Sequence, residues 1–138
     1  MKKSESRSGQ VVEFLKVLED VKIQVEADAF ESEDAEMVET LCRNMATVFQ
    51  LPKGQLITIG GEKKSAEQVQ AIYSLIKHEN IEHIITSFQE IKYKVKHITT
   101  YLRTALYNSV FESSAFWENR VNTALHSQAV PNATRKTN

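Results

Sequence analysis

Residues 80–91 read NIEHIITSFQEI, the clearest hydrophobic pattern in this chain of 138 residues. The apolar side chains recur every three or four positions, at Ile81, Ile84, Ile85, Phe88 and Ile91. Because an α-helix turns once every 3.6 residues, this spacing places them on one face. The stretch therefore predicts an amphipathic helix with one side in a hydrophobic core.

Helical spacing recurs on both sides of this stretch. Residues 11–25 form a first such segment, with Val11, Phe14, Leu15 and Leu18 on one side. The acidic residues 31–34 favour a helix start, since negative charge stabilises a helix N-terminus. Residues 65–68, SAEQ, match a capping box and predict another start. The expected core contains Val38, Leu41, Cys42, Met45, Val69, Ile72, Ile76, Ile81, Ile84, Ile85, Phe88, Ile98, Leu102 and Leu106.

One segment departs from this spacing. Residues 55–59, QLITI, are rich in strand formers, and Gly60 and Gly61 follow with the backbone freedom of a tight turn. We therefore predict a two-stranded hairpin over residues 55–64 that leans on the helices, because an isolated hairpin is only marginally stable. The expected fold is mainly α, a compact bundle of five or six helices with one small two-stranded β-hairpin.

The domain organisation follows from where this pattern fades. Residues 10–127 are expected to form one helical domain between disordered tails at 1–9 and 128–138, which are polar and aperiodic. The net charge of −1 combines an acidic first part, with 11 acidic and 6 basic residues in 1–50, with a mildly basic middle. Neither a signal peptide nor a membrane span is predicted, which favours a cytoplasmic protein.

The sequence predicts no catalytic site, cofactor or metal. The four histidines, His78, His83, His97 and His126, include no pair four residues apart, and Glu79 with His83 is a single possible ligand pair. No phosphate-binding glycine motif surrounds the Gly-Gly turn, and no serine is placed in a nucleophile motif. The single cysteine, Cys42, cannot form an internal disulfide and is expected to be structural.

The strongest functional pattern is the basic connector, residues 92–97, which read KYKVKH. Its lysines alternate with a tyrosine and a valine. Clustered cations neutralise phosphates, and exposed aromatic rings stack on unpaired bases. The alternative is a solvated turn between two helices. Two lysines of the hairpin extend the patch if the fold brings them close. The candidate residues for binding nucleic acid or a partner are Lys92, Lys94, Lys96, His97, Arg103, Lys63 and Lys64.

Several motifs occur in a suggestive order between about residue 20 and about residue 122. They include ETLC at 39–42, ITIGGE at 57–62, AEQV at 66–69 and NIEH at 80–83. The most specific is KVKHI at 94–98, followed by YL at 101–102 and TALYN at 104–108. In this order the chain resembles the C-terminal domain of RepA-type plasmid replication initiators of Gram-positive bacteria. That domain is similar to the helical domain of the primosome protein DnaD.

The resemblance implies a DnaD-like fold and a role at a plasmid or phage origin. It implies that the domain recruits host replication machinery, either primase or a helicase-loading protein, and that Lys94, Lys96 and Arg103 are its functional polar positions. Two departures stand out: His97 replaces a usual asparagine, and Ser109 occupies the place of a tryptophan in DnaD relatives. Since no winged-helix domain precedes the match, we expect an excised domain or a free-standing relative.

Three non-enzymatic functions are therefore open. The first is recruitment of a host replication protein, and the second is DNA binding without sequence preference through the basic connector. The third is self-association through Phe116 and Trp117, which makes a homo-oligomer conceivable. A plasmid, phage or chromosomal origin of the gene is left open.

Overall fold

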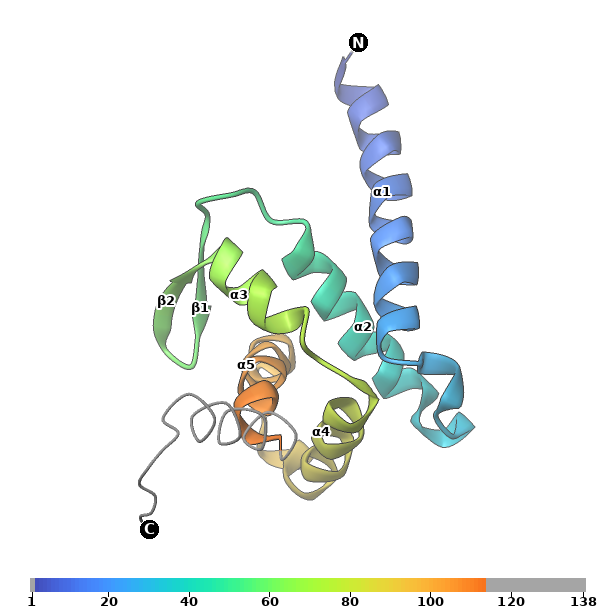
Figure 1. Ribbon diagram of the computed structural model, residues 1–138, viewed down its shortest axis with the longest axis vertical. Coiled ribbons are helices and arrows are strands. Elements are labelled where there is room, and N and C mark those ends of the chain that lie inside the picture. Colours follow the sequence, from blue (N-terminus) through green and yellow to red (C-terminus); the bar gives the residue numbers. More distant parts are fainter. Residues whose placement is uncertain (1, 114–138) are drawn as a thin grey trace, which may run out of the picture.

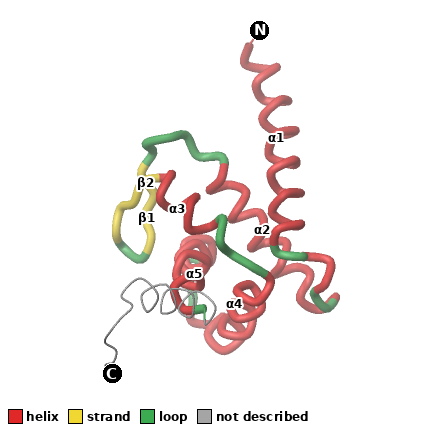
Figure 2. The backbone as a smooth tube through the Cα atoms, viewed as in Figure 1, coloured by secondary structure: helices red, strands yellow, loops and turns green. Residues whose placement is uncertain are grey.

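The computed structural model describes residues 2–113, and the side chains of residues 7–113 within them. These residues form a mainly helical fold with one antiparallel hairpin (Figures 1 and 2), which confirms the predicted class. The elements are α1 (Lys2–Gln24), η1 (Ala27–Ala29), η2 (Ser32–Asp34), α2 (Ala35–Phe49), β1 (Leu56–Ile59), β2 (Glu62–Ser65), α3 (Ala66–Tyr73), α4 (His78–Ile91), η3 (Lys92–Lys94) and α5 (Ile98–Glu112), where η marks a 3-10 helix.

Helix α2 lies at the centre of the packing and contacts α1, α3, α4 and α5. Cys42 of this helix is fully buried, as predicted, and its burial raises the pKa of the thiol to about 11. Two expected core residues differ. Ile72 is half-buried, and Ile98 is 44% exposed because it begins α5 at the edge of the basic connector. All the other expected core residues are buried.

Helix α1 differs most from its prediction. It begins at Lys2, so residues 2–9, for which the sequence predicts a disordered tail, extend the helix. Each added helical residue gains a backbone hydrogen bond, which favours such an extension. The buried residues are Leu18, Val21 and Val25, whereas Val11 and Leu15 are exposed. The reason is that the N-terminal half of α1 projects beyond the other helices (Figure 1).

A second group of predictions lies outside the described residues. It comprises the disordered tail at 128–138, His126, and self-association through Phe116 and Trp117.

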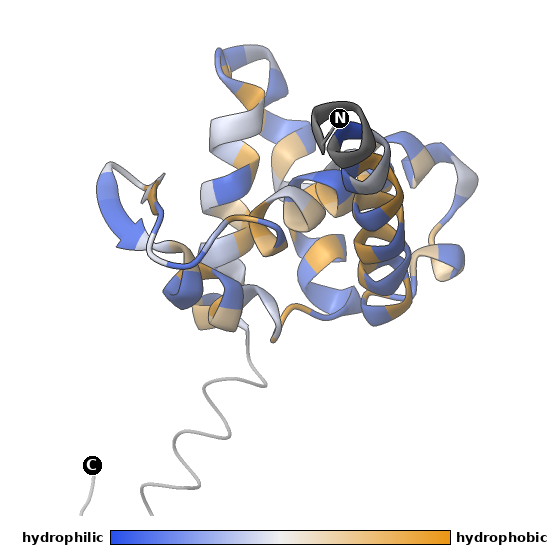
Figure 3. Ribbon diagram, turned by 90° about the horizontal axis from the view of Figure 1, so that it is seen from above, coloured by the Kyte–Doolittle hydropathy of each residue, from blue (hydrophilic) through white to orange (hydrophobic). Residues whose placement is uncertain are grey.

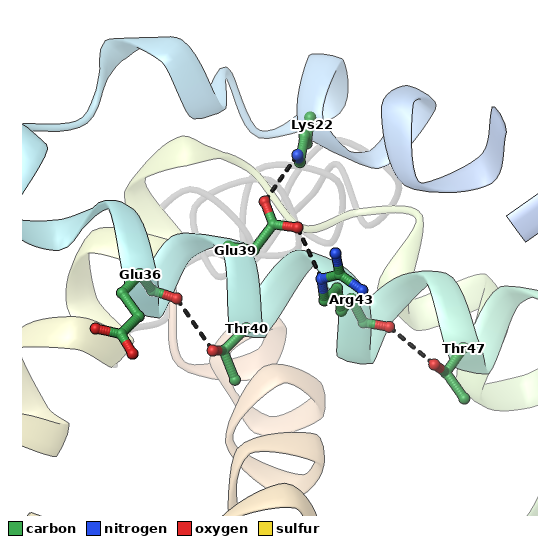
Figure 4. Close-up of polar contacts among 6 residues, drawn as sticks. All are labelled: Lys22, Glu36, Glu39, Thr40, Arg43 and Thr47. Carbon is green, nitrogen blue, oxygen red and sulfur yellow. Dashed lines mark hydrogen bonds and ion pairs between the residues drawn. The ribbon is translucent and has the colours of Figure 1, made fainter. Parts of the chain in front are cut away.

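Ion pairs and hydrogen bonds join α1 to its neighbours. Glu39 of α2 binds Lys22 of α1 and Arg43 one turn further along α2, both at 2.7 Å (Figure 4). The hydrogen bond from Lys22 lowers the pKa of the Glu39 carboxyl, and Glu39 in turn raises the pKa of Lys22. Gln24 Nε2 donates to the backbone oxygens of Tyr73 and Ile76 at 3.0 and 2.8 Å. These contacts fix the C-terminal half of α1 on the core.

The hairpin and its capped helix match the prediction closely. Leu56 pairs with Ser65 and Ile59 with Glu62, and both turn glycines have positive φ. The Ser65 side chain accepts from the Gln68 backbone N–H at 3.2 Å and caps α3. The second half of the capping box differs, because the Gln68 amide donates to the Tyr107 hydroxyl of α5 at 3.1 Å instead.

Candidate nucleic-acid interface

The basic connector joins two packed helices and is itself mostly exposed. Helix α4 ends at Ile91, η3 makes one turn, and Val95 turns to an extended conformation before His97 precedes α5. Val95 is half-buried and packs against the hydrophobic core. Val95 therefore attaches the connector to the hydrophobic core, while the polar side chains of the connector remain in solvent.

The ends of the connector are fixed by α2 and α5. The Asn44 side chain of α2 donates to the Thr99 backbone oxygen at 3.1 Å. Behind the connector, the rings of Phe88 in α4 and Tyr101 in α5 lie 5.9 Å apart between centroids. These contacts hold the end of α4 against the start of α5. The basic connector is therefore attached at both ends to packed helices.

The polar side chains of the connector are exposed to solvent, although Lys92 Nζ also donates to the Gln89 side-chain oxygen at 3.2 Å. Lys92, Lys94, Lys96 and His97 are exposed, and none of the three lysines is ion-paired with a carboxylate of the described part of the chain. Tyr93 is 90% exposed, and Lys92 Nζ lies 5.4 Å from the centroid of its ring. A cation and an aromatic face thus adjoin each other on the surface, which is the combination that single-stranded nucleic acids bind.

Arg103 does not join this surface. It is half-buried, and its Nε is buried without a hydrogen-bond partner. Its backbone oxygen accepts a hydrogen bond from the Tyr73 hydroxyl at 2.7 Å. Burial raises the pKa of Tyr73, and the nearby Arg103 charge opposes that rise. Arg103 therefore belongs to the contact between α3 and α5.

The hairpin lysines lie apart from the connector as well. The hairpin meets α5 at Thr104, whose Oγ1 accepts from the Gly60 backbone N–H at 3.0 Å. Lys64 binds Glu62 at 3.3 Å and lies over the Tyr107 ring at 5.5 Å. Because Tyr107 is nine residues beyond the start of α5, Lys64 sits about 13 Å along that helix from the connector. Lys63 is exposed and, as the neighbour of Lys64 in strand β2, lies on the opposite face of the hairpin. The hydrophilic strand β2 is the arrow at the left edge of Figure 3.

An acidic groove lies at the other end of α4. Two adjoining cavities of about 510 and 400 Å³ share Glu79 and His83 in their linings. The larger one also contains Glu31, Asp34 and Glu82. Its apolar lining is formed by Ala29, Phe30 and Ile85. Sequence patterns missed this groove, because its carboxylates come from segments nearly fifty residues apart; the acidic first part of the chain was the available signal.

His78 makes contacts that support the fold. His78 stacks on Phe30 with centroids 3.9 Å apart, its Nδ1 lies 3.0 Å from the Val25 backbone oxygen, and its Nε2 lies 3.5 Å from Glu82. Glu79 and His83 both line the acidic groove. Within residues 2–113, no group of three or more His, Cys, Asp or Glu side chains is arranged to hold a metal ion.

Comparisons with protein-family models, curated proteins and solved structures find no match to this chain. Among the described helices, none has the length and apolar character needed to cross a membrane.

Proposed function

We propose that this chain is a non-enzymatic binding domain that contacts DNA through the basic connector. Lys92, Lys94 and Lys96 neutralise backbone phosphates, and Tyr93 stacks on an unpaired base. Charge neutralisation of this kind carries no sequence information, so the binding is expected to be independent of sequence. The setting implied by the resemblance is replication initiation in the bacterial cytoplasm.

One observation carries the proposal: Tyr93 is 90% exposed within a run of lysines that have no described carboxylate partner. A large aromatic ring in water forgoes the free energy of its burial, roughly 1.5–3 kcal/mol for a side chain of this size. Turns are dominated by Gly, Pro, Asn, Asp and Ser, so a tyrosine is not the residue that the turn itself requires. An exposed ring beside free cations is better explained by a ligand.

The test is fluorescence anisotropy of labelled single-stranded and double-stranded DNA over a salt series. We expect affinity to fall steeply with salt, and Lys94→Ala/Lys96→Ala to weaken binding. Losing two phosphate contacts lowers the slope of log K against log salt by about 1.8 for duplex and about 1.4 for single strands. Absent binding at low salt, or affinity that is insensitive to salt, contradicts the proposal.

The matched control is Lys53→Ala/Lys77→Ala, which removes the same charge from two other exposed lysines. If DNA is attracted merely by overall charge, both double variants lose affinity equally. If the connector is the binding surface, the control retains most of the wild-type affinity and its salt slope.

A second candidate is recruitment of a host replication protein, which the resemblance implies. The acidic groove supports it, since a cavity of about 510 Å³ that combines carboxylates with Phe30 and Ile85 suits a basic, partly apolar segment of a partner. A pull-down with host primase and helicase loader should retain one of them and lose it in Glu79→Lys/Glu82→Lys. Retention of neither protein by the wild-type chain rejects this candidate.

A further inference from the structure

The described part of the chain ends beside the acidic groove. Ser113, the last described residue, lines the smaller of the two cavities together with Glu112 of α5 and Glu79 of α4. Glu79 and His83 also line the larger cavity, so the two cavities adjoin along α4. Residues 114–138 therefore continue the chain from a point beside this groove.

The linings of the two cavities carry one sign of charge. Among the described residues they contain no lysine or arginine and the carboxylates of Glu31, Asp34, Glu79, Glu82 and Glu112. In the same part of the chain only Glu82 of this set has an ion-pair partner, the imidazole of His78 at 3.5 Å. Like charges around a concave surface repel one another, and a cation in the groove relieves this repulsion.

The larger cavity also has an apolar surface. Ala29 and Phe30 form it from the end of η1, and Ile85 forms it from α4. The volume of this cavity, about 510 Å³, is typical of pockets that cover large ligand groups. The groove therefore suits a segment in which aromatic side chains stand close to a basic one.

The chain itself contains such a segment directly after Ser113. Residues 114–121 read SAFWENRV, in which the aromatic residues Phe116 and Trp117 are followed by the cation Arg120. Arg120 is one of three basic residues after Ser113, and only one acidic residue accompanies them. The segment is thus net basic, whereas the groove is acidic.

These side chains are close enough to Ser113 along the chain to reach the groove. An extended chain spans about 3.3–3.6 Å per residue, so Phe116 and Trp117 can lie up to roughly 10–14 Å from Ser113. A helix with its side chains is about 10–12 Å across. Both rings can therefore pass Glu79 and His83 of α4 and enter the larger cavity.

We propose that residues 114–121 bind in the acidic groove of the same molecule, with Trp117 against the apolar lining and Arg120 beside the carboxylates. Binding within one molecule is favoured because the segment is attached beside the groove at Ser113, which gives it a high effective concentration there. The proposal does not depend on DNA binding. A partner protein that uses the groove has to displace this segment. The proposal also gives Phe116 a role other than self-association.

The fluorescence of Trp117 tests the proposal in the full chain without a label, because this residue is the only tryptophan. We expect acrylamide to quench the fluorescence severalfold less in buffer than in concentrated urea, since the groove covers the indole ring. Glu79→Lys/Glu112→Lys should raise the quenching toward its value in urea, because two cations then face Arg120. Circular dichroism confirms that the variant remains helical.

The matched control is Glu13→Lys/Glu90→Lys, which makes the same change in net charge at two exposed carboxylates outside the cavity linings. This control should leave the quenching of Trp117 unchanged. Adding Arg120→Glu to the groove variant places opposite charges together again and should restore the protection.

Three results overturn the proposal. The first is a tryptophan that acrylamide quenches as strongly in buffer as in urea. The second is equal quenching in the groove variant and its control. The third is protection that appears only as the protein concentration rises, because the segment then binds a second molecule instead of its own groove.

Discussion

The two ends of α4 differ in how their side chains are bound. The N-terminal end is joined to the rest of the fold by side-chain contacts, whereas the C-terminal end leads into exposed side chains. At its N-terminal end, Asn80 accepts from the Lys77 backbone N–H at 2.7 Å and donates to the Ser109 backbone oxygen at 3.0 Å, and His78 stacks on Phe30. The C-terminal end, about 20 Å away along the helix, continues into the basic connector, whose lysines and Tyr93 have solvent around them.

The charges at these ends match the helix dipole. Glu79 lies in the first turn, and Lys92 and Lys94 follow the last one, which stabilises α4 by some tenths of a kcal/mol at each end. The dipole explains the sign of the charge at each end. It does not explain why one end is bound into the core by hydrogen bonds while the other exposes an aromatic ring. The hydrogen bonds of the first end serve the fold, whereas the exposure of the second end supports the proposed DNA binding.

The largest expected effect is a loss of stability on substitution of Asn80, at the N-terminal end of α4. Asn80→Ala removes both hydrogen bonds of a side chain that is 5% exposed and leaves the Ser109 oxygen without that donor. We expect a loss of about 2 kcal/mol in the free energy of unfolding, measured by urea denaturation. Asn80→Asp keeps the acceptor for the Lys77 N–H and should lose less. Equal losses in the two variants would contradict the assigned role of the Lys77 contact, because that is the contact that only Asn80→Asp retains.

The second largest expected effect is on the DNA affinity of the basic connector, which follows the C-terminal end of α4. Tyr93→Ala should lower the affinity for single-stranded DNA by about tenfold, because stacking on one base contributes roughly 1–3 kcal/mol. Duplex binding should change little, and Tyr93→Phe should retain the wild-type affinity for both substrates. Anisotropy with matched single-stranded and double-stranded oligonucleotides checks this. A Tyr93→Ala variant with unchanged affinity for single strands leaves the ring without a role in binding.

The sequence predicts the position of α4, of the hairpin and of the basic connector. Periodicity at Ile81, Ile84 and Phe88 locates α4 and its buried face, and Gly60 and Gly61 locate the hairpin, because both signals are local. The exposed connector was also predicted. The position of Arg103 against Tyr73 was not, because it depends on how α3 and α5 pack.

Other errors have the same physical origin. Val11 lies on the same side of α1 as the buried Leu18 but is exposed, because the N-terminal half of α1 projects beyond the other helices, and no spacing within α1 encodes this. Ile98 fits a helical stripe, yet it lies where the stripe passes beyond the core. Local patterns identify the elements, whereas the length and position of neighbouring elements decide which of their faces is covered.

A smaller effect on stability is expected when the ion-paired carboxylate Glu39 is removed, compared with the unpaired carboxylate Glu33 in the same acidic part of the chain. Glu39 is ion-paired, and its pKa is lowered mainly by the hydrogen bond from Lys22. Its stabilisation is therefore fully present above the unfolded pKa of roughly 4.3 and is lost as pH falls through the lower folded pKa. Glu39→Gln should cost about 0.5–1 kcal/mol at neutral pH, since both partners are partly exposed. Glu33→Gln, at an exposed and unpaired site, is the control for denaturation measured at neutral and acidic pH.

The smallest expected effect on stability is that of Lys94→Ala/Lys96→Ala, and it tests whether these lysines serve binding or the fold. Lys94→Ala/Lys96→Ala removes two exposed charges without a described ion-pair partner, so the free energy of unfolding should change by less than about 0.5 kcal/mol. The same variant is expected to weaken DNA binding. A variant that loses affinity while keeping its urea midpoint assigns the lysines to binding alone. If stability falls together with affinity, the connector contributes to the fold, and the two ends of α4 are less different than their contacts indicate.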